Sequence, residues 1–166
     1  GHGRQWIGPV RQFGNGGVID VARIHIQNPY WHQGGGGWMY RSADVVPVDR
    51  AITNRAVIEL QDVVCHNARH AEQRDTCGVL TNVRDGAVRG MPGVSSIDVC
   101  RGDSGGSVYF LPGNGERWAY GLVSMILLGP SGVCSDGNPM WFSPLPEVYR
   151  FFDTNSPGSN IRVETR

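Results

Sequence analysis

Hydrophobic and polar residues alternate along much of the chain in short stretches, which is the pattern of half-buried β-strands. The first stretch lies at 16–26, and six more follow at 55–65, 77–83, 86–91, 106–111, 117–128 and 139–145. Turn-forming residues separate them at 84–86, 112–115, 129–132 and 135–139. Several short strands at this spacing predict an all-β barrel or sandwich.

Three other stretches interrupt or end this pattern. The stretch 27–50, with four consecutive glycines and two prolines, predicts a linker or a long surface crossing. A proline followed by apolar residues at helical spacing predicts one short helix at 144–152. The chain is therefore expected to divide into 1–26, a linker at 27–50, a main β unit at 51–152 and a tail at 153–166.

Composition agrees with this division and excludes several classes of partner. The 24 glycines among 166 residues suit many tight turns, and a hydrophobic content of 40% excludes a disordered chain. The formal net charge is zero, which argues against nucleic acid and anionic membrane surfaces as partners. No apolar run is long enough for a membrane-spanning helix.

The four cysteines, Cys65, Cys77, Cys100 and Cys134, include no C-x-x-C pair, so a zinc or redox site is weakly supported. Three disulfide pairings are open to them. An even number in a glycine-rich β chain favours a secreted protein, the alternative being free thiols in the cytosol. His66 and His70 have metal-ligand spacing for a helix, but a hairpin is predicted there, so neither a metal nor a cofactor is expected.

Candidate chemistry centres on Ser104, which lies in the sequence GDSGG at 102–106. A serine hydroxyl becomes a nucleophile when a base takes its proton, and the oxyanion that develops needs backbone N–H donors. The surrounding glycines allow a sharp turn and close approach of a substrate. The alternatives are a glycine-rich hairpin with an incidental serine, or an adhesion tripeptide RGD at 101–103, which would have to be exposed.

The order of the residues limits which catalytic triad is available. GDSGG also fits the nucleophile elbow of α/β-hydrolases, whose histidine follows the serine, but all five histidines (2, 25, 32, 66 and 70) precede Ser104. The order Asp20, His66 or His70, then Ser104 would suit a subtilisin-like enzyme, but the helix–strand alternation of that fold is absent. The order histidine, aspartate, serine remains.

GDSGG in a cysteine-bearing β chain resembles the chymotrypsin-type serine proteases, in particular the short bacterial streptogrisin-like and lytic-protease-like members. DVARIHI at 20–26 is similar to the strand that begins with the triad aspartate. The stretch 63–81 resembles the family's cysteine-bridged hairpin, 120–124 its substrate-pairing strand and 139–145 the strand that closes its specificity pocket. Together the resemblance covers roughly 16–26 and 55–152.

The resemblance implies a trypsin-like double β-barrel in which 1–26 is the end of the first barrel, 27–50 the inter-barrel linker and 51–152 a complete second barrel with a short C-terminal helix. It implies disulfides Cys65–Cys77 and Cys100–Cys134. It also implies a secreted serine endopeptidase that acts on protein or peptide substrates without a cofactor. A pro-segment or a missing N-terminal part is a possible further partner.

The resemblance also assigns roles to individual residues. Ser104 would be the nucleophile, Asp20 would orient the histidine, and the N–H groups of Gly102 and Ser104 would form the oxyanion hole. Asp103 would hold the loop through a buried ion pair, for which His66, Arg69 and Arg101 are the candidate partners. Ser124 would begin the substrate-pairing strand.

Substrate specificity has two open interpretations. Asp98 takes the place of the acid at the floor of the trypsin pocket, which would select arginine or lysine before the scissile bond. Met140 and Ile126 fall near wall positions that are glycine in trypsin, and Met125 replaces the usual aromatic residue. The alternative is a shallow pocket for small or medium apolar side chains, with Asp98 pointing elsewhere.

The catalytic histidine is the part of the pattern that is not met. Only His2 precedes Asp20, at a short spacing and followed by Gly3 where the family has cysteine. We therefore expect the catalytic histidine upstream of residue 1, and this chain alone to be weakly active or inactive. The alternative function is a non-catalytic protease homologue, a binding module that has kept the serine.

Overall fold

The computed structural model describes residues 10–16, 19–24, 38–40, 45–67, 76–83, 87–89, 98–135, 137–158, 160–163 and 165–166. Short strands are the main regular structure of these residues, and one short 3-10 helix, Arg55–Val57, and one α-helix, α1 (Leu145–Asn155), complete the described elements. The strands are β1 (Val10–Gly16), β2 (Ile19–Ile24), β3 (Trp38–Tyr40), β4 (Val45–Pro47), β5 (Arg50–Ala51), β6 (Val63–Asn67), β7 (Thr76–Asn82), β8 (Ala87–Arg89), β9 (Ser107–Phe110), β10 (Trp118–Ile126) and β11 (Met140–Pro144).

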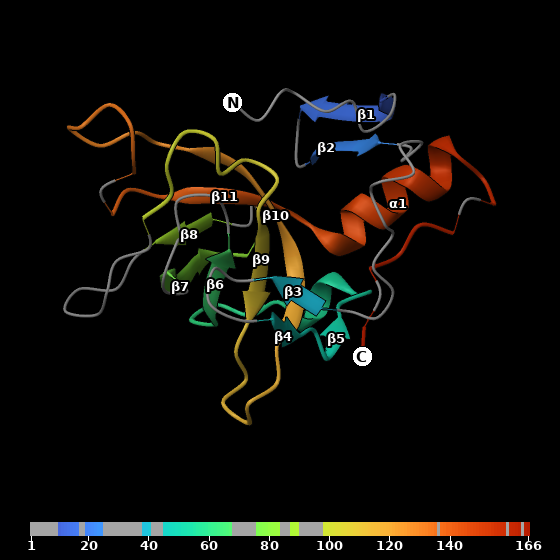
Figure 1. Cartoon of the computed structure of the whole chain (residues 1–166), viewed down its shortest axis with the longest axis horizontal. Coiled ribbons are helices and arrows are strands. Elements are labelled where there is room, and N and C mark those ends of the chain that lie inside the picture. The colour runs from blue at the N-terminus through green and yellow to red at the C-terminus, as the bar shows by residue number, and fades with distance from the viewer. Residues whose placement is uncertain are drawn as a thin grey trace.

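Seven of these strands form the main sheet, in the order β11-β8-β7-β6-β9-β10-β5 (Figure 1). Neighbouring strands are antiparallel, except that β5 runs parallel to β10. Strand β10 also pairs with β11, so it is hydrogen-bonded to β9, β5 and β11 along its length. The described chain is thus mostly β-sheet with one C-terminal helix, which confirms the all-β class, whereas the double barrel stays a prediction.

Two hairpins lie outside the main sheet. In the first, β1 pairs with β2, and Val21 of β2 packs against Val148 and Phe152 of α1. Residues of β2 also lie close to β10 and β11, and Figure 1 shows this hairpin along one edge of the molecule beside α1. The expected remnant of the first barrel is therefore placed against the strands that carry the other candidate residues.

The second hairpin pairs β3 with β4 inside the stretch predicted to be a linker. The sequences WMY and VVP consist of aromatic, β-branched and other apolar residues with a proline at the end, which suits a short strand pair. Val46 of β4 is buried with Cys65 and Tyr109. The described residues of the predicted linker therefore include a strand pair, and Val46 covers one face of β6 and β9.

The main hydrophobic core is formed by residues of the seven-stranded sheet, of neighbouring segments and of α1. Leu80, Val108, Tyr120 and Met140 have no exposed surface and pack with residues of α1 such as Leu145. Gly121 of β10 is required by the packing, because a Cβ atom there would overlap the Phe142 ring and the backbone oxygen of Ser143. Close pairing of β10 and β11 thus depends on a residue without a side chain.

Helix α1 confirms the predicted C-terminal helix and extends it by three residues, to Asn155. It begins after Pro144, with Pro146 in the first turn, where a missing N–H costs no hydrogen bond. Glu147 in that turn complements the positive end of the helix and accepts from Arg55 Nη1 at 3.1 Å. Among the described helices, none has the length and apolar character to cross a membrane.

One predicted strand is much shorter than its pattern suggested. The stretch 55–65 begins with the 3-10 turn, which Asn54 caps by accepting from Ala56 N at 2.9 Å. Gln61 has a φ of 72°, and the Asp62 carboxylate accepts from Glu59 N at 2.9 Å. These local side-chain bonds form turns, so regular strand geometry starts only at Val63.

Candidate active site

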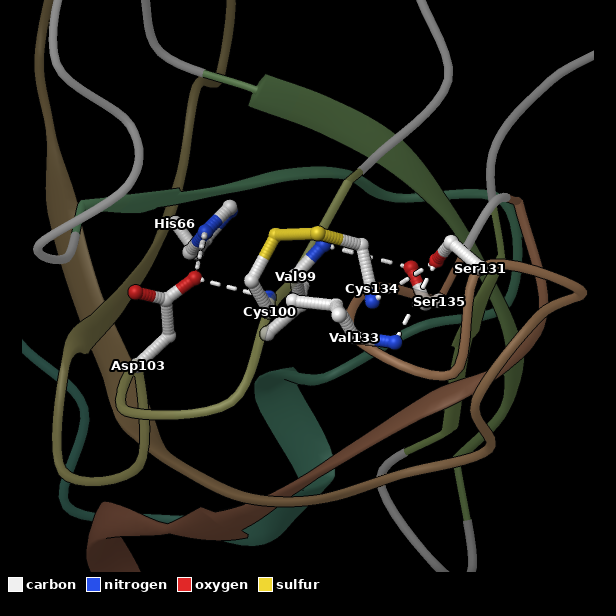
Figure 2. Close-up of a disulfide and its surroundings, with 8 residues drawn as sticks. All are labelled: His66, Val99, Cys100, Asp103, Ser131, Val133, Cys134 and Ser135. Atoms are coloured by element: carbon white, nitrogen blue, oxygen red, sulfur yellow. Dashed lines mark hydrogen bonds and ion pairs between the residues drawn. A yellow bond between two sulfur atoms is a disulfide. The ribbon is translucent and has the colours of Figure 1, made fainter.

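The segment that leads to Ser104 is fastened to a second loop by a disulfide and three hydrogen bonds. Cys100 and Cys134 are joined at an S–S distance of 2.03 Å and form an isolated antiparallel bridge. Arg101 N donates to Val133 O at 3.0 Å and Ser135 N to Val99 O at 2.9 Å. The Ser135 hydroxyl accepts from Val99 N at 3.2 Å (Figure 2). The approach to the GDSGG loop is therefore fixed on one side.

Two consecutive β-turns then place Ser104 at an exposed corner. Asp103 N donates to Cys100 O at 3.1 Å, and Gly106 N donates to Asp103 O at 2.9 Å. The third residue of each turn is a glycine with positive φ, 98° at Gly102 and 85° at Gly105. Type II turns require such a conformation, which other L-residues adopt only with strain. The glycines of GDSGG therefore shape the backbone around an accessible serine.

The far side of the loop is anchored to β10. Gly105 N donates to Val123 O at 2.8 Å, and Val123 N donates to Gly106 O at 2.8 Å. Ser124, half-buried, is the next residue of β10. The GDSGG loop and β10 are thus held side by side.

Asp103 points inward from the same loop and is 1% exposed. Its Oδ2 atom accepts from Cys100 N at 2.8 Å and lies 3.8 Å from His66 Nε2, and both side chains are fully shielded from solvent (Figure 2). The contact with His66 is longer than a hydrogen bond, so it is a charge–dipole or charge–charge contact. Of the three candidate partners for Asp103, His66 faces it and Arg101 is exposed, whereas Arg69 lies outside the described residues.

The orientation of His66 is set by the β6–β7 hairpin. Cys65 pairs with Cys77 and His66 pairs with Thr76, and Thr76 Oγ1 lies 2.5 Å from His66 Nδ1. A carboxylate can only accept, so the proton of the neutral ring belongs on Nε2, facing Asp103. Nδ1 then accepts from the Thr76 hydroxyl. The hairpin thus supplies both the imidazole and the hydroxyl that contacts its Nδ1 atom, and Asp103 favours the tautomer.

Burial lowers the pKa of His66 below its ordinary value of 6.5, because the charged imidazolium loses its hydration. The Asp103 carboxylate opposes this shift but does not reverse it. The folded protein therefore holds His66 neutral under conditions in which the unfolded chain has already begun to protonate it.

We expect the free energy of unfolding to decrease as the pH falls below about 6.5, because the unfolded chain takes up a proton that folded His66 resists. The loss is complete below the lowered pKa of His66 and absent above 6.5. Urea unfolding at pH 7.5, 6.5 and 5.5 measures it. A His66→Gln variant should lose this part of the pH dependence, and an unchanged slope would contradict the assignment.

Both disulfides implied by the family resemblance are present. Cys65–Cys77 bridges β6 and β7 with an S–S distance of 2.01 Å, and none of the four cysteines is free. Disulfides persist in oxidising environments, so two of them suggest an extracellular or secreted protein. Asp98 lies near the Cys100 and Cys134 sulfurs, but disulfide sulfurs are not thiolate ligands, so this group is not a metal site.

The residues expected to line a specificity pocket fall into two groups. Asp98 and Met125 are exposed, with Met125 54% exposed, and Ile126 is half-buried. Met140 has no exposed surface and belongs to the main core. Met140 therefore packs inward, and the exposed position of Asp98 differs from the buried floor that basic specificity would use.

Several of the predicted site residues lie partly or wholly outside the described part of the structure. Asp20 is paired with Asn15 in the β1–β2 hairpin, and its side chain is outside the described part. His2, Arg69 and the histidines at 25, 32 and 70 also lie outside the described residues. Arg101 is exposed and Asp103 buried, so the RGD tripeptide has no accessible carboxylate, which argues against adhesion.

Comparisons with protein-family models, characterised proteins and solved structures gave no match to this chain. The resemblance to chymotrypsin-type proteases therefore stays a prediction carried by the motifs and the geometry above.

Proposed function

We propose that this protein is a serine endopeptidase of the chymotrypsin type that cleaves peptide bonds through an acyl-enzyme on Ser104. The observation that carries the proposal is the GDSGG loop, which combines an exposed serine, two glycine turns and a buried aspartate. An incidental serine in a hairpin needs neither the inward Asp103 nor its histidine contact. The trypsin-like barrel is part of the same proposal, supported by the pairing of β10 with both β9 and β11.

In the proposed reaction, Ser104 Oγ attacks the scissile carbonyl while a base takes its proton. The carbonyl oxygen becomes an oxyanion that the N–H groups of Gly102 and Ser104 stabilise. Within the described residues, neither N–H donates to a backbone carbonyl, which leaves both available for that role. The intermediate then releases the amine, which receives the proton, and water hydrolyses the acyl-enzyme.

The proposed base is a histidine outside the described residues, oriented by Asp20 of β2. His66 does not fit the role, because its ring is fully buried and faces Asp103, whereas Ser104 is exposed. His66 is instead assigned a positioning role behind the loop. His2 is the only histidine of this chain in the family order, and it lies outside the described residues.

Peptide substrates would run along β10 beside Ser124, with the residue before the scissile bond near Met125 and Ile126. The exposed Asp98 and the inward Met140 favour a shallow site for small or medium apolar side chains over a deep basic one. The two disulfides support secretion as the setting of this activity.

The alternative is a non-catalytic protease homologue that binds peptides along β10. It keeps the loop geometry but has no base, so its Ser104 would have ordinary hydroxyl reactivity. The exposed apolar residues Met125, Leu127 and Val133 would serve binding equally well in either case. Only the reactivity of Ser104 separates the two functions.

Fluorophosphonate labelling, followed by intact-mass measurement, tests the reactivity of Ser104. These reagents label serine only when a base activates it, so we expect little or no adduct on this chain alone and a single adduct when imidazole is added, which disappears in the Ser104→Ala variant. Labelling that appears only with added imidazole would show a competent loop whose base is not supplied by this chain. No adduct under either condition would contradict the proposal and favour the binding module.

A further inference from the structure

A cleft of about 510 Å³ lies between the segment 53–55 and helix α1. Its walls include Arg55, Tyr149, Arg150, Asp153 and Arg162, and none of its lining residues belongs to the GDSGG loop or to β10. A volume of this size is in the range of sites that bind small organic molecules or single side chains of a partner. It is therefore separate from the proposed active site.

Two of the three arginines in this cleft already hold carboxylates. Arg162 donates to the Asp153 carboxylate through both terminal nitrogens, from Nη1 to Oδ1 at 3.0 Å and from Nη2 to Oδ2 at 2.9 Å. Its guanidinium lies 4.8 Å from the centre of the Tyr149 ring. Arg55 binds Glu147 at 3.1 Å and also donates to the backbone oxygen of Val83. Both side chains are therefore oriented by contacts within the protein.

Arg150 differs in its contacts from Arg55 and Arg162, the other two arginines of the cleft. It is exposed on α1, and within the part of the chain that the structure describes it has no hydrogen bond, ion pair or ring contact. Among the described residues, Arg162 and Arg55 have carboxylate partners, Asp153 and Glu147, whereas Arg150 has none. One positive charge in the cleft is thus uncompensated, beside the polar side chains of Thr53 and Thr154.

We propose that this cleft binds a carboxylate-bearing ligand, with Arg150 as the group that receives the carboxylate. The planar fork of arginine matches a carboxylate in a bidentate geometry, which the Arg162–Asp153 pair already displays on the same wall. The cleft is larger than one carboxylate, so the rest of the ligand contacts the Tyr149 side of the wall. The carboxylate belongs either to a small organic acid or to an acidic residue of a peptide.

The test is an NMR titration of the full chain carrying Ser104→Ala, so that no probe can be cleaved and the result is independent of the proposed protease activity. The probes are succinate, the blocked peptide acetyl-Gly-Glu-Gly-amide and inorganic phosphate, each at low ionic strength. We expect saturable shifts at α1, with Arg150→Gln weakening binding about fivefold. Asp153→Asn should strengthen binding at least twofold, because it releases Arg162 from a competing carboxylate.

The matched control is Arg50→Gln, which removes the same charge from an exposed arginine outside the cleft. Equal weakening by Arg50→Gln and Arg150→Gln, or tighter binding of phosphate than of either carboxylate probe, would overturn the proposal. Saturation by succinate alone identifies a free acid as the ligand, and saturation by the peptide alone identifies an acidic residue of a protein. Both of these outcomes support the carboxylate site.

Discussion

Replacing Cys100 and Cys134 together by alanine is expected to lower the free energy of unfolding by about 4 kcal/mol. The two cysteines are 34 residues apart in the sequence, so the disulfide removes considerable freedom from the unfolded chain. The folded protein also loses the closure that holds Val99 and Arg101 against the loop at 133–135. Urea unfolding at pH 7.5, well above the range in which His66 titrates, measures the change.

The matched control for this prediction is the Cys65→Ala and Cys77→Ala double variant. Its cysteines are only 12 residues apart, so the expected loss is smaller, about 3 kcal/mol. The two variants should also differ in fluorophosphonate labelling, because the Cys100–Cys134 bridge adjoins the GDSGG loop directly. Equal losses of stability in both variants would show that the longer closed segment retains its order without the bridge.

Replacing Asp103 by alanine is expected to cost about 2 kcal/mol of stability and to abolish the labelling of Ser104 in the presence of imidazole. The change leaves one buried donor, Cys100 N, without its acceptor and removes the carboxylate that faces His66 Nε2 at 3.8 Å. Each buried polar group without a partner costs about 1–3 kcal/mol. The turn that ends at Asp103 loses its internal anchor at the same time, so the corner occupied by Ser104 loses its fixed position.

An Asp103→Asn variant keeps the shape of the Asp103 side chain and removes its negative charge, so it distinguishes the effects of the two. The asparagine oxygen can still accept from Cys100 N, so about 1 kcal/mol of loss is expected. Labelling should decrease in both variants, by more in the alanine variant, if the loop geometry controls the reactivity of Ser104. A stable alanine variant that labels at the normal rate would contradict the role given to Asp103.

Much of the fold could be predicted from the sequence, because alternation of apolar and polar residues reports burial directly. The stretch 117–128 became β10, and 139–145 became β11 followed by the helix. The stretch 55–65 failed, since the capping side chain of Asn54 and the turn at Gln61 form bonds that hydrophobicity does not reveal. The β3–β4 pairing was missed because each strand is only three residues long.

The candidate site shows the same difference: its local turns could be predicted from the sequence, and its tertiary contacts could not. The glycine turns around Ser104 follow from the local sequence GDSGG, since positive φ is a property of single residues. The contact of Asp103 with His66 depends on tertiary packing of β6 against the loop, so three candidates stayed open. Thr76 was not among the predicted site residues. Its place next to Cys77 could have indicated it, because the pairing of Cys65 with Cys77 sets Thr76 opposite His66.

The pairing of Cys65 with Cys77 also has a consequence for the timing of folding. A slip of one residue between β6 and β7 would turn every side chain of the hairpin to the other face, and His66 would point away from Asp103. The bridge forbids that slip once it has formed. We expect oxidation of this hairpin to precede the final ordering of the serine loop. A chain released into a reducing compartment would then carry an intact GDSGG sequence around a proposed nucleophile whose supporting histidine is not yet fixed in register.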